Sequence, residues 1–213
     1  MFVADNHVYP LSYNPRSENY SEHLFSWAAT IQNELGTVNH TNTGLIFWHR
    51  GVWQCPSAIT PATLPRQQEI SEYLNYLSYG YNGFGLSVPT DTNTLGLTRH
   101  YIWNGLRSGP PVSESEIASP SDMMAIGDGF WNVNGIIHDG SMTLWRTYSA
   151  ENTVGLFGGT KQSYARHQGK ANVVFCDGHV ESPTLQFLFE DTSDDALVRW
   201  NRDHLPHREK LSP

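Results

Sequence analysis

Residues 166–182 read RHQGKANVVFCDGHVES, and this stretch decides the fold class. An apolar, partly β-branched run at 171–176 is followed by Asp177-Gly178 and then by a second short run at 179–182. Asp-Gly favours a two-residue type I′ turn, because both central positions of that turn need positive φ. The stretch therefore predicts an antiparallel β-hairpin that reverses at Asp177-Gly178.

Segments upstream of this hairpin are also typical of strands. Residues 122–128 form an apolar run that ends in a turn, as a buried strand does, and residues 79–86 are typical of a strand followed by a turn. Short extended segments are expected at 45–48 and 52–54. Residues 89–120 predict a long loop with short strands, and residues 131–165 are rich in glycine and polar residues.

Helical periodicity is clearest near the N-terminus, where apolar side chains recur at helical spacing within residues 19–36. Asn19 and Glu22 can close the start of this helix, and Gly36 can end it. A second helix is predicted at 67–77, where apolar residues keep the helical period.

A last helix is predicted at 193–204, with Thr192 or Ser193 as its cap and with Leu197 and Trp200 turned inward. The chain has no internal repeat and no visible domain boundary. Residues 1–213 therefore predict a single α+β domain, with an N-terminal helix followed by mostly antiparallel strands and long loops.

The overall composition excludes some classes of protein. Thirteen Lys and Arg against 21 Asp and Glu give a net charge of −8, and nucleic-acid binding needs a dense basic face instead. No stretch approaches the roughly 18 apolar residues of a membrane helix, and residues 1–6 lack the basic and apolar regions of a secretory signal. The two cysteines fit either a disulfide in an exported protein or two buried thiols in a cytosolic one.

His167 is followed by nine residues and then by Asp177-Gly178, and this H-x9-DG element at 166–182 resembles the C-terminal domain of prepilin-type pseudopilins of bacterial type II secretion systems. Five further segments are similar to landmarks of that family and occur in the family's order: residues 1–10, 55–57, 78–83, 119–128 and 199–207.

The resemblance implies a pilin-like globular head, in which the N-terminal helix is a truncated anchor packed on the sheet. It implies a structural subunit of the cell envelope, not an enzyme, with no cofactor other than calcium and with other pseudopilin-like subunits, secretion-system components or exported cargo as partners. The family's Gly-Phe-Thr-Leu-x-Glu cleavage site and apolar anchor do not precede Met1, so the chain by itself is expected to stay a monomer or weak dimer. An envelope location would favour a disulfide between Cys55 and Cys176, although Cys176 stands where the family often has alanine.

The H-x9-DG element allows two interpretations. His167, Asp177 and His179 could converge on a divalent metal ion, because imidazole and carboxylate suit a borderline or hard cation, and a metal-dependent hydrolase would be built there. The favoured alternative is structural, with Asp177-Gly178 forming the turn and His167 bonded to a neighbouring loop. Family members hold calcium in a C-terminal loop, but the spacing of the acidic residues available here does not match an EF-hand: Asp177, Glu190, Asp191, Asp194 and Asp195.

Other residues are weaker candidates. Asp128, at the end of a predicted strand, is either a catalytic carboxylate or a turn residue. His204 and His207 have a spacing that suits a metal on a helix, but Pro206 should end the helix between them. A glycan- or ligand-binding module is the alternative function, in which exposed aromatic rings stack on sugars; the same rings could instead cover the core. These residues are Trp48, Trp53, Trp103, Trp131 and Trp145.

Overall fold

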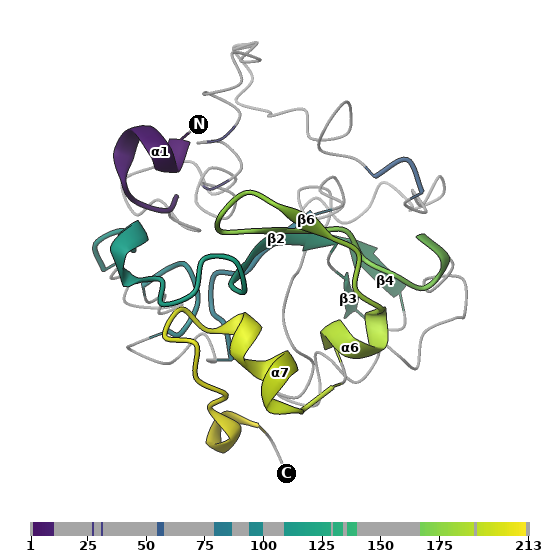
Figure 1. Ribbon diagram of the computed structural model, residues 1–213. Helices are drawn as coiled ribbons and strands as arrows, with labels where there is room; N and C mark the ends of the chain where they lie inside the picture. The colour runs from purple at the N-terminus through teal and green to yellow at the C-terminus, as the bar shows by residue number, and fades with distance from the viewer. Residues whose placement is uncertain are drawn as a thin grey trace.

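The computed structural model describes residues 2–10, 27, 31, 55–57, 79–86, 94–99, 109–128, 130–133, 136–139, 167–189 and 191–211. The fold of these residues is mixed α and β, with short helices and antiparallel strands (Figure 1). The strands are β1 (Tyr79–Tyr81), β2 (Met124–Asp128), β3 (Phe130–Val133), β4 (Ile136–Asp139), β5 (Val173–Phe175) and β6 (Val180–Glu181). The α-helices are α1 (Phe2–Asn6), α6 (Leu185–Phe189) and α7 (Asp194–Leu197), and the 3₁₀ helices are η2 (Glu114–Glu116), η4 (Val198–Trp200) and η5 (Arg208–Lys210).

A four-stranded antiparallel sheet with the order β1-β2-β5-β6 forms the centre of the fold. The strands predicted at 79–86 and 122–128 and the hairpin at 171–182 are confirmed as β1, β2 and β5–β6. The register places Asp128, the last residue of β2, opposite Tyr79 in β1. The backbone N–H of Asp128 also donates to the carbonyl of Asn172, just before β5, at 3.0 Å. The end of β2 is therefore held on both sides.

The turn of the β5–β6 hairpin differs from the prediction. The N–H of Gly178 donates to the carbonyl of Phe175 at 3.0 Å, and Gly178 has a φ of 93°. Asp177 is not among the described residues with positive φ, so a type I′ turn is excluded. The chain reverses over Cys176 and Asp177 and then uses a left-handed glycine to rejoin the partner strand, as longer hairpin loops do.

A second hairpin, β3–β4, was not predicted. Val133 pairs with Ile136, and Phe130 pairs with Asp139. Asn134-Gly135 separates the two paired residues in the sequence, and Asn-Gly between apolar residues is a strong hairpin signal. The hairpin was not expected because residues 131–165 as a whole are rich in glycine and polar residues.

Two buried clusters form the core, and β2 contributes to both. Met124 and Ala125 are adjacent in β2, and they belong to different clusters because successive side chains of a strand point to opposite faces; Met123, just before β2, lies in the cluster of Ala125. A register irregularity between Met124 and Ile126 then keeps the pattern from repeating strictly. Ile126 packs against the cluster of Met123 instead of that of Met124.

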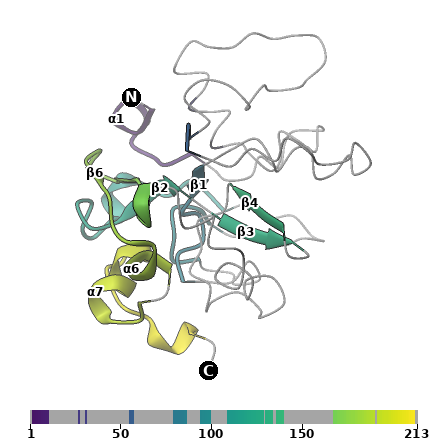
Figure 2. The same cartoon turned by 90° about the vertical axis from the view of Figure 1, so that its right-hand side faces the viewer.

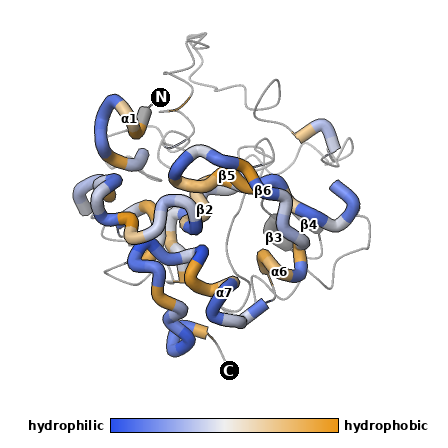
Figure 3. The backbone as a smooth tube through the Cα atoms, in the orientation of Figure 1, coloured by the Kyte–Doolittle hydropathy of each residue, from blue (hydrophilic) through white to orange (hydrophobic). Residues whose placement is uncertain are grey.

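Helices α6 and α7 cover one side of the sheet, and α1 lies on the other side in both views (Figures 1 and 2). The cluster on the α6 and α7 side is the larger of the two. Figure 3 shows hydrophobic stretches, in orange, on both of these helices. Its members are Leu86, Leu95, Met124, Ala171, Val173, Phe175, Leu185, Leu188, Phe189, Leu197 and Trp200.

The predicted C-terminal helix is confirmed in position but is shorter than expected. It begins after Ser193 as α7 and ends as η4 at Trp200, and Leu197 and Trp200 are buried as predicted. Asn201 is extended and buried, and its side chain accepts from the N–H of Leu86 at 3.1 Å. A helix that continued through Asn201 would lose this contact with a distant loop. Helix α6 was not predicted, because its five residues are too few to show a period.

Of the predicted N-terminal helix at 19–36, the structure describes Trp27 and Ile31, and both are helical. The predicted helix at 67–77 and the segments at 45–48 and 52–54 lie outside the described residues. Within the described part of the chain, none of the helices combines the length and the apolar character needed to cross a membrane.

Candidate functional site

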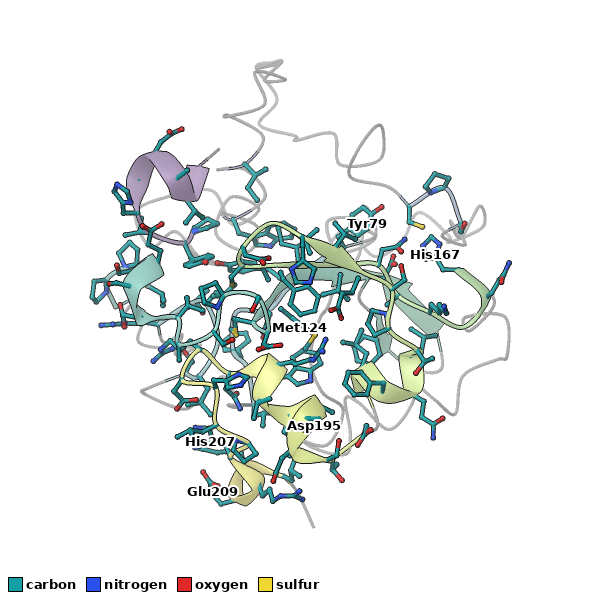
Figure 4. The ribbon with its side chains drawn as sticks, in the orientation of Figure 1. Tyr79, Met124, His167, Asp195, His207 and Glu209 are labelled. Atoms are coloured by element: carbon teal, nitrogen blue, oxygen red, sulfur yellow. The ribbon has the colours of Figure 1, made fainter. Side chains whose placement is uncertain are left out.

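Three side chains that could bind a metal meet at the end of the sheet where β2 stops. Asp128 ends β2 and is fully buried, His167 lies a few residues before β5, and Cys55 is buried. His167 lies at the same end of the sheet as Tyr79, away from Met124 at the start of β2 (Figure 4). Asp128 was predicted to be either a turn residue or a catalytic carboxylate, and it is a buried strand-end carboxylate that faces an imidazole.

The three groups converge on one nitrogen atom. His167 Nε2 lies 3.1 Å from Cys55 Sγ and 3.3 Å from Asp128 Oδ2. One ligand atom from each residue lies within 4.8 Å of the other two, and this is the only such group of three among the described residues. A nucleophilic Cys-His-Asp triad uses opposite nitrogens of the ring for the thiol and the carboxylate, so this geometry does not match one.

Asn172 holds the arrangement from the side of β5. Its backbone N–H donates to Asp128 Oδ2 at 2.7 Å, and its side-chain Nδ2 lies 3.3 Å from His167 Nε2. The Asn172 side-chain oxygen accepts a hydrogen bond from the Ser182 hydroxyl at 2.9 Å. The carboxylate and the imidazole are thus oriented by the same residue.

The backbone before β5 explains how His167 reaches this position. His167, Gln168 and Gly169 all have positive φ, at 49°, 59° and 81°. A left-handed conformation costs about 1–2 kcal/mol for a residue other than glycine, so other contacts must hold this turn. One of them is the hydrogen bond from the Leu185 N–H to the Gly169 carbonyl at 3.0 Å, which ties the turn to the start of α6.

The possible convergence of His167 with Asp177 and His179, the less favoured interpretation, is not observed, because β5 lies between them. His167 and Asn172 precede β5, and Asp177 and His179 follow it. An extended strand advances about 3.3 Å per residue, so the four steps from Asn172 to Cys176 span roughly 13 Å. The nine-residue spacing therefore covers the rest of the left-handed turn and the whole of β5, with the histidine before the strand and Asp-Gly in the turn after it.

Asp177 and His179 form a separate polar cluster at the tip of the hairpin. Asp177 Oδ1 lies 2.6 Å from His179 Nδ1, and Glu181 Oε1 lies 3.4 Å from Nε2 of the same ring. Arg199 donates to the other oxygen of Glu181 at 2.7 Å. The hydrogen bond between the Asp177 carboxylate and the His179 ring raises the pKa of His179. The hydrogen bond from the backbone N–H of His179 is the main cause that lowers the pKa of Asp177.

Cys55 and Cys176, considered as a possible disulfide, are both free thiols in the structure. Cys55 contacts His167, whereas Cys176 follows β5 at the opposite end of the strand and packs against the cluster that contains Tyr9. Burial raises the pKa of the Cys176 thiol to about 12, so this thiol stays protonated at neutral pH. Cys176 is therefore a partly buried thiol beside this cluster that hydrogen-bonds with Tyr9, whereas Cys55 lies beside His167 and Asp128.

The acidic residues considered for calcium do not gather. Asp191 accepts from the N–H of Ser193, Asp194 pairs with Arg208, and Asp195 is exposed. Glu190 lies outside the described residues, and the described members form no group of three ligands. His207 Nε2 lies 2.7 Å from Asp203 Oδ2, and His207 Nδ1 lies 2.9 Å from Glu209 Oε1. Both ring nitrogens are therefore engaged in hydrogen bonds near the C-terminal end.

The aromatic residues considered for glycan binding fall mostly outside the described part. Trp48, Trp53, Trp103 and Trp145 lie outside it, and Trp131 lies in β3, paired with His138. The structure therefore leaves the glycan-binding hypothesis a prediction.

Comparison with known proteins gives no relative from which a role can be transferred. No protein-family model matches the chain, and no curated protein and no solved structure shows significant similarity to it. What the chain does must therefore be argued from its own residues and geometry.

Proposed function

We propose that the protein is a structural subunit, the globular head of a pseudopilin-like component of a bacterial type II secretion or type IV pilus-like system. In this proposal the head has a pilin-like arrangement, works in the cell envelope, and contacts other subunits of the same kind or secretion-system components. It binds its neighbours rather than transforming a substrate.

One observation carries the proposal: the segments that resemble the family's landmarks contact one another in space. The Tyr81 hydroxyl donates to the carbonyl of Pro10 at 2.9 Å, and the Cys176 N–H donates to the carbonyl of Met123 at 2.9 Å. The side chain of Asn82 donates to the carbonyls of Met124 and Trp200, at 2.9 Å and 3.0 Å. Cys55 contacts His167. The proposal requires these segments to belong to one connected unit, and the contacts between them support that requirement.

A contact of the N-terminal helical segment gives further support. The ring of Trp27 stacks on that of Tyr81 in β1, with centroids 5.4 Å apart and planes 15° from parallel. Trp27 is buried. A helix at 19–36 that carries this residue would therefore lie against the sheet, as the proposed pilin-like head requires.

The proposal can be tested with a chimera that places a prepilin leader before Met1, containing the Gly-Phe-Thr-Leu-x-Glu site and about 20 apolar residues. The chimera is expressed in a bacterium that has a prepilin peptidase. We expect the leader to be cleaved and the heads to form cross-linked ladders in the membrane fraction. A genuine pseudopilin head on the same leader is the positive control, and an unrelated acidic domain of similar size is the negative control.

The informative comparison is between cleavage and cross-linking. If the chimera is cleaved and reaches the membrane but cross-links no more than the unrelated domain, the head has no affinity for its neighbours and the proposal is wrong.

A further inference from the structure

We infer that Cys55, Asp128 and His167 bind one divalent transition-metal ion of the zinc class. The ligand atoms are Cys55 Sγ, a carboxylate oxygen of Asp128 and His167 Nε2. The inference is independent of the proposed structural role, because it rests on this site alone.

The separations of the ligand atoms fit a tetrahedral ion. With bonds of about 2.3, 2.0 and 2.1 Å to sulfur, nitrogen and oxygen, tetrahedral angles place sulfur and nitrogen about 3.5 Å apart and nitrogen and oxygen about 3.4 Å apart. The structure has 3.1 Å between Cys55 Sγ and His167 Nε2 and 3.3 Å between Nε2 and Asp128 Oδ2. The third separation, between Cys55 Sγ and the Asp128 carboxylate, is within 4.8 Å, compared with about 3.6 Å around a tetrahedral ion.

Hydrogen bonds alone cannot satisfy all the short contacts of His167 Nε2 at the same time. A ring nitrogen carries either one hydrogen or one lone pair in the plane of the ring. If Nε2 of His167 carries the hydrogen, it can point squarely at the thiol sulfur or at the carboxylate, but not at both. If Nε2 carries the lone pair, the Cys55 thiol or the Asn172 amide can donate to it, but the nearby Asp128 oxygen, an acceptor at 3.3 Å, cannot. A cation at the common point is attracted to all three ligands.

The types of donor select the ion. A thiolate, an imidazole and a carboxylate together suit zinc and its neighbours in the first transition series. Calcium and magnesium take oxygen ligands, and only one of these three donors is an oxygen. Three protein ligands leave a fourth position for water or another small ligand, as in zinc sites that exchange a ligand.

The surroundings suit a site that admits an ion from one side. The side chain of Asp128 is 0% exposed and that of His167 is 23% exposed, so the approach is past the imidazole. The hydrogen bond from the Asn172 N–H to Asp128 Oδ2 orients the carboxylate, as partners of metal ligands commonly do. A bound ion would join the segment around Cys55 to the end of β2 and to the turn before β5.

The test uses the full chain, reduced and stripped of metal, titrated with Co²⁺ as a spectroscopic substitute for Zn²⁺. We expect one equivalent to bind, with a thiolate-to-cobalt charge-transfer band in the near ultraviolet that Zn²⁺ abolishes by competition. Cys55→Ser should lose the band, and Cys176→Ser is the matched control that should keep it. His167→Gln and Asp128→Asn should weaken binding by at least tenfold, since changes to outer-shell partners alone cost about 10–100-fold.

A second measurement uses the wild-type chain and so does not depend on the folding of any variant. In the wild-type chain, Zn²⁺ should slow alkylation of Cys55, mapped by mass spectrometry, and should raise the melting temperature. Absence of one-equivalent binding in the wild type overturns the inference. So does a charge-transfer band that survives Cys55→Ser, or zinc that leaves the alkylation of Cys55 unchanged.

Discussion

His179 has an aromatic, an acidic and a basic environment within a few ångströms. Its ring stacks on Phe175 with centroids 4.4 Å apart, and its two nitrogens face Asp177 and Glu181. Arg199 pairs with Glu181 and lies over the ring of Phe175, 5.6 Å from its centroid. This arrangement favours the protonated imidazole and makes the hairpin tip sensitive to pH.

The sign of this pH dependence follows from the direction of each pKa shift. The pKa of His179 is raised, so its contribution to stability is complete below the unfolded value of about 6.5 and is lost as the pH rises through the folded value. The pKa of Asp177 is lowered, so its contribution is present above about 3.9 and is lost as the pH falls through its folded value. Between these limits both groups are charged.

We therefore predict that His179→Gln lowers the melting temperature most at about pH 5.5 and much less at about pH 8.5, where the wild-type imidazole is losing its proton. Thermal melts of both proteins across this range check the prediction. Asp177→Asn, which removes the carboxylate bonded to the ring, should flatten the wild-type profile in the same region. A difference between wild type and His179→Gln that does not change with pH would contradict this account of the cluster.

Substitutions at Gly178 measure the energetic cost of its backbone conformation separately from any cost of steric crowding. Its φ is 93°, and a Cβ added there would meet nothing within 4 Å. Gly178→Ala should lower the free energy of unfolding by about 1 kcal/mol, and Gly178→Val by roughly 1–3 kcal/mol, from backbone strain alone. Gly178→Asn should cost less, because asparagine tolerates left-handed φ better. Urea denaturation measures all three, and equal stability of the valine variant and the wild type would show that the turn does not require glycine.

At the scale of elements, the buried Asn82 joins three parts of the fold. Its side-chain nitrogen donates to the carbonyls of Met124 in β2 and Trp200 in η4, and its side-chain oxygen accepts from the N–H of Gly85. No helix or strand contains Asn82, but its backbone N–H donates to the carbonyl of Ala125 and its carbonyl accepts from the N–H of Leu97, each at 2.9 Å, so backbone and side chain together fix this junction.

Asn82→Ala should lower the free energy of unfolding by at least about 2 kcal/mol, because it leaves several buried polar groups without this partner at about 1–3 kcal/mol each. Gln186→Ala, on the exposed side of α6, is the control and should change stability by no more than about 0.5 kcal/mol. Chemical denaturation compares the two variants. If Asn82→Ala costs no more than the control, then water or backbone rearrangement replaces the three bonds.

The elements that could be predicted are those whose local pattern also decides their packing. Residues 122–128 and 171–182 alternate or cluster apolar residues between turn signals, and both form strands. The turn type was wrong because Asp177-Gly178 is compatible with more than one loop length, and the pairing of Phe175 with His179 selects the longer loop. Helix α6 was missed because its burial against Trp200 and its neighbours, rather than a period of its own, favours it.

At the scale of the whole molecule, the site could not be predicted from local spacing. Cys55 and His167 are 112 residues apart, and none of the three converging residues has a second ligand nearby in sequence. In the sequence, Asp128 is marked only as the end of a predicted strand, and Cys55 only as one of two cysteines. The sheet brings them together: the pairing of β2 with β5 places Asp128 beside the turn that carries His167.

The short edge strand β6 limits how another molecule can contact the sheet. β6 closes the sheet with two residues, Val180 and Glu181, and Pro183, which has no N–H to offer, follows almost at once. Val180 is 61% exposed, yet an incoming strand would find too short a row of backbone groups, interrupted by a carboxylate and a proline, to add to the sheet there. Another molecule that packs against this edge would therefore contact it through side chains, and substitution could alter such contacts while the backbone ladder stays intact.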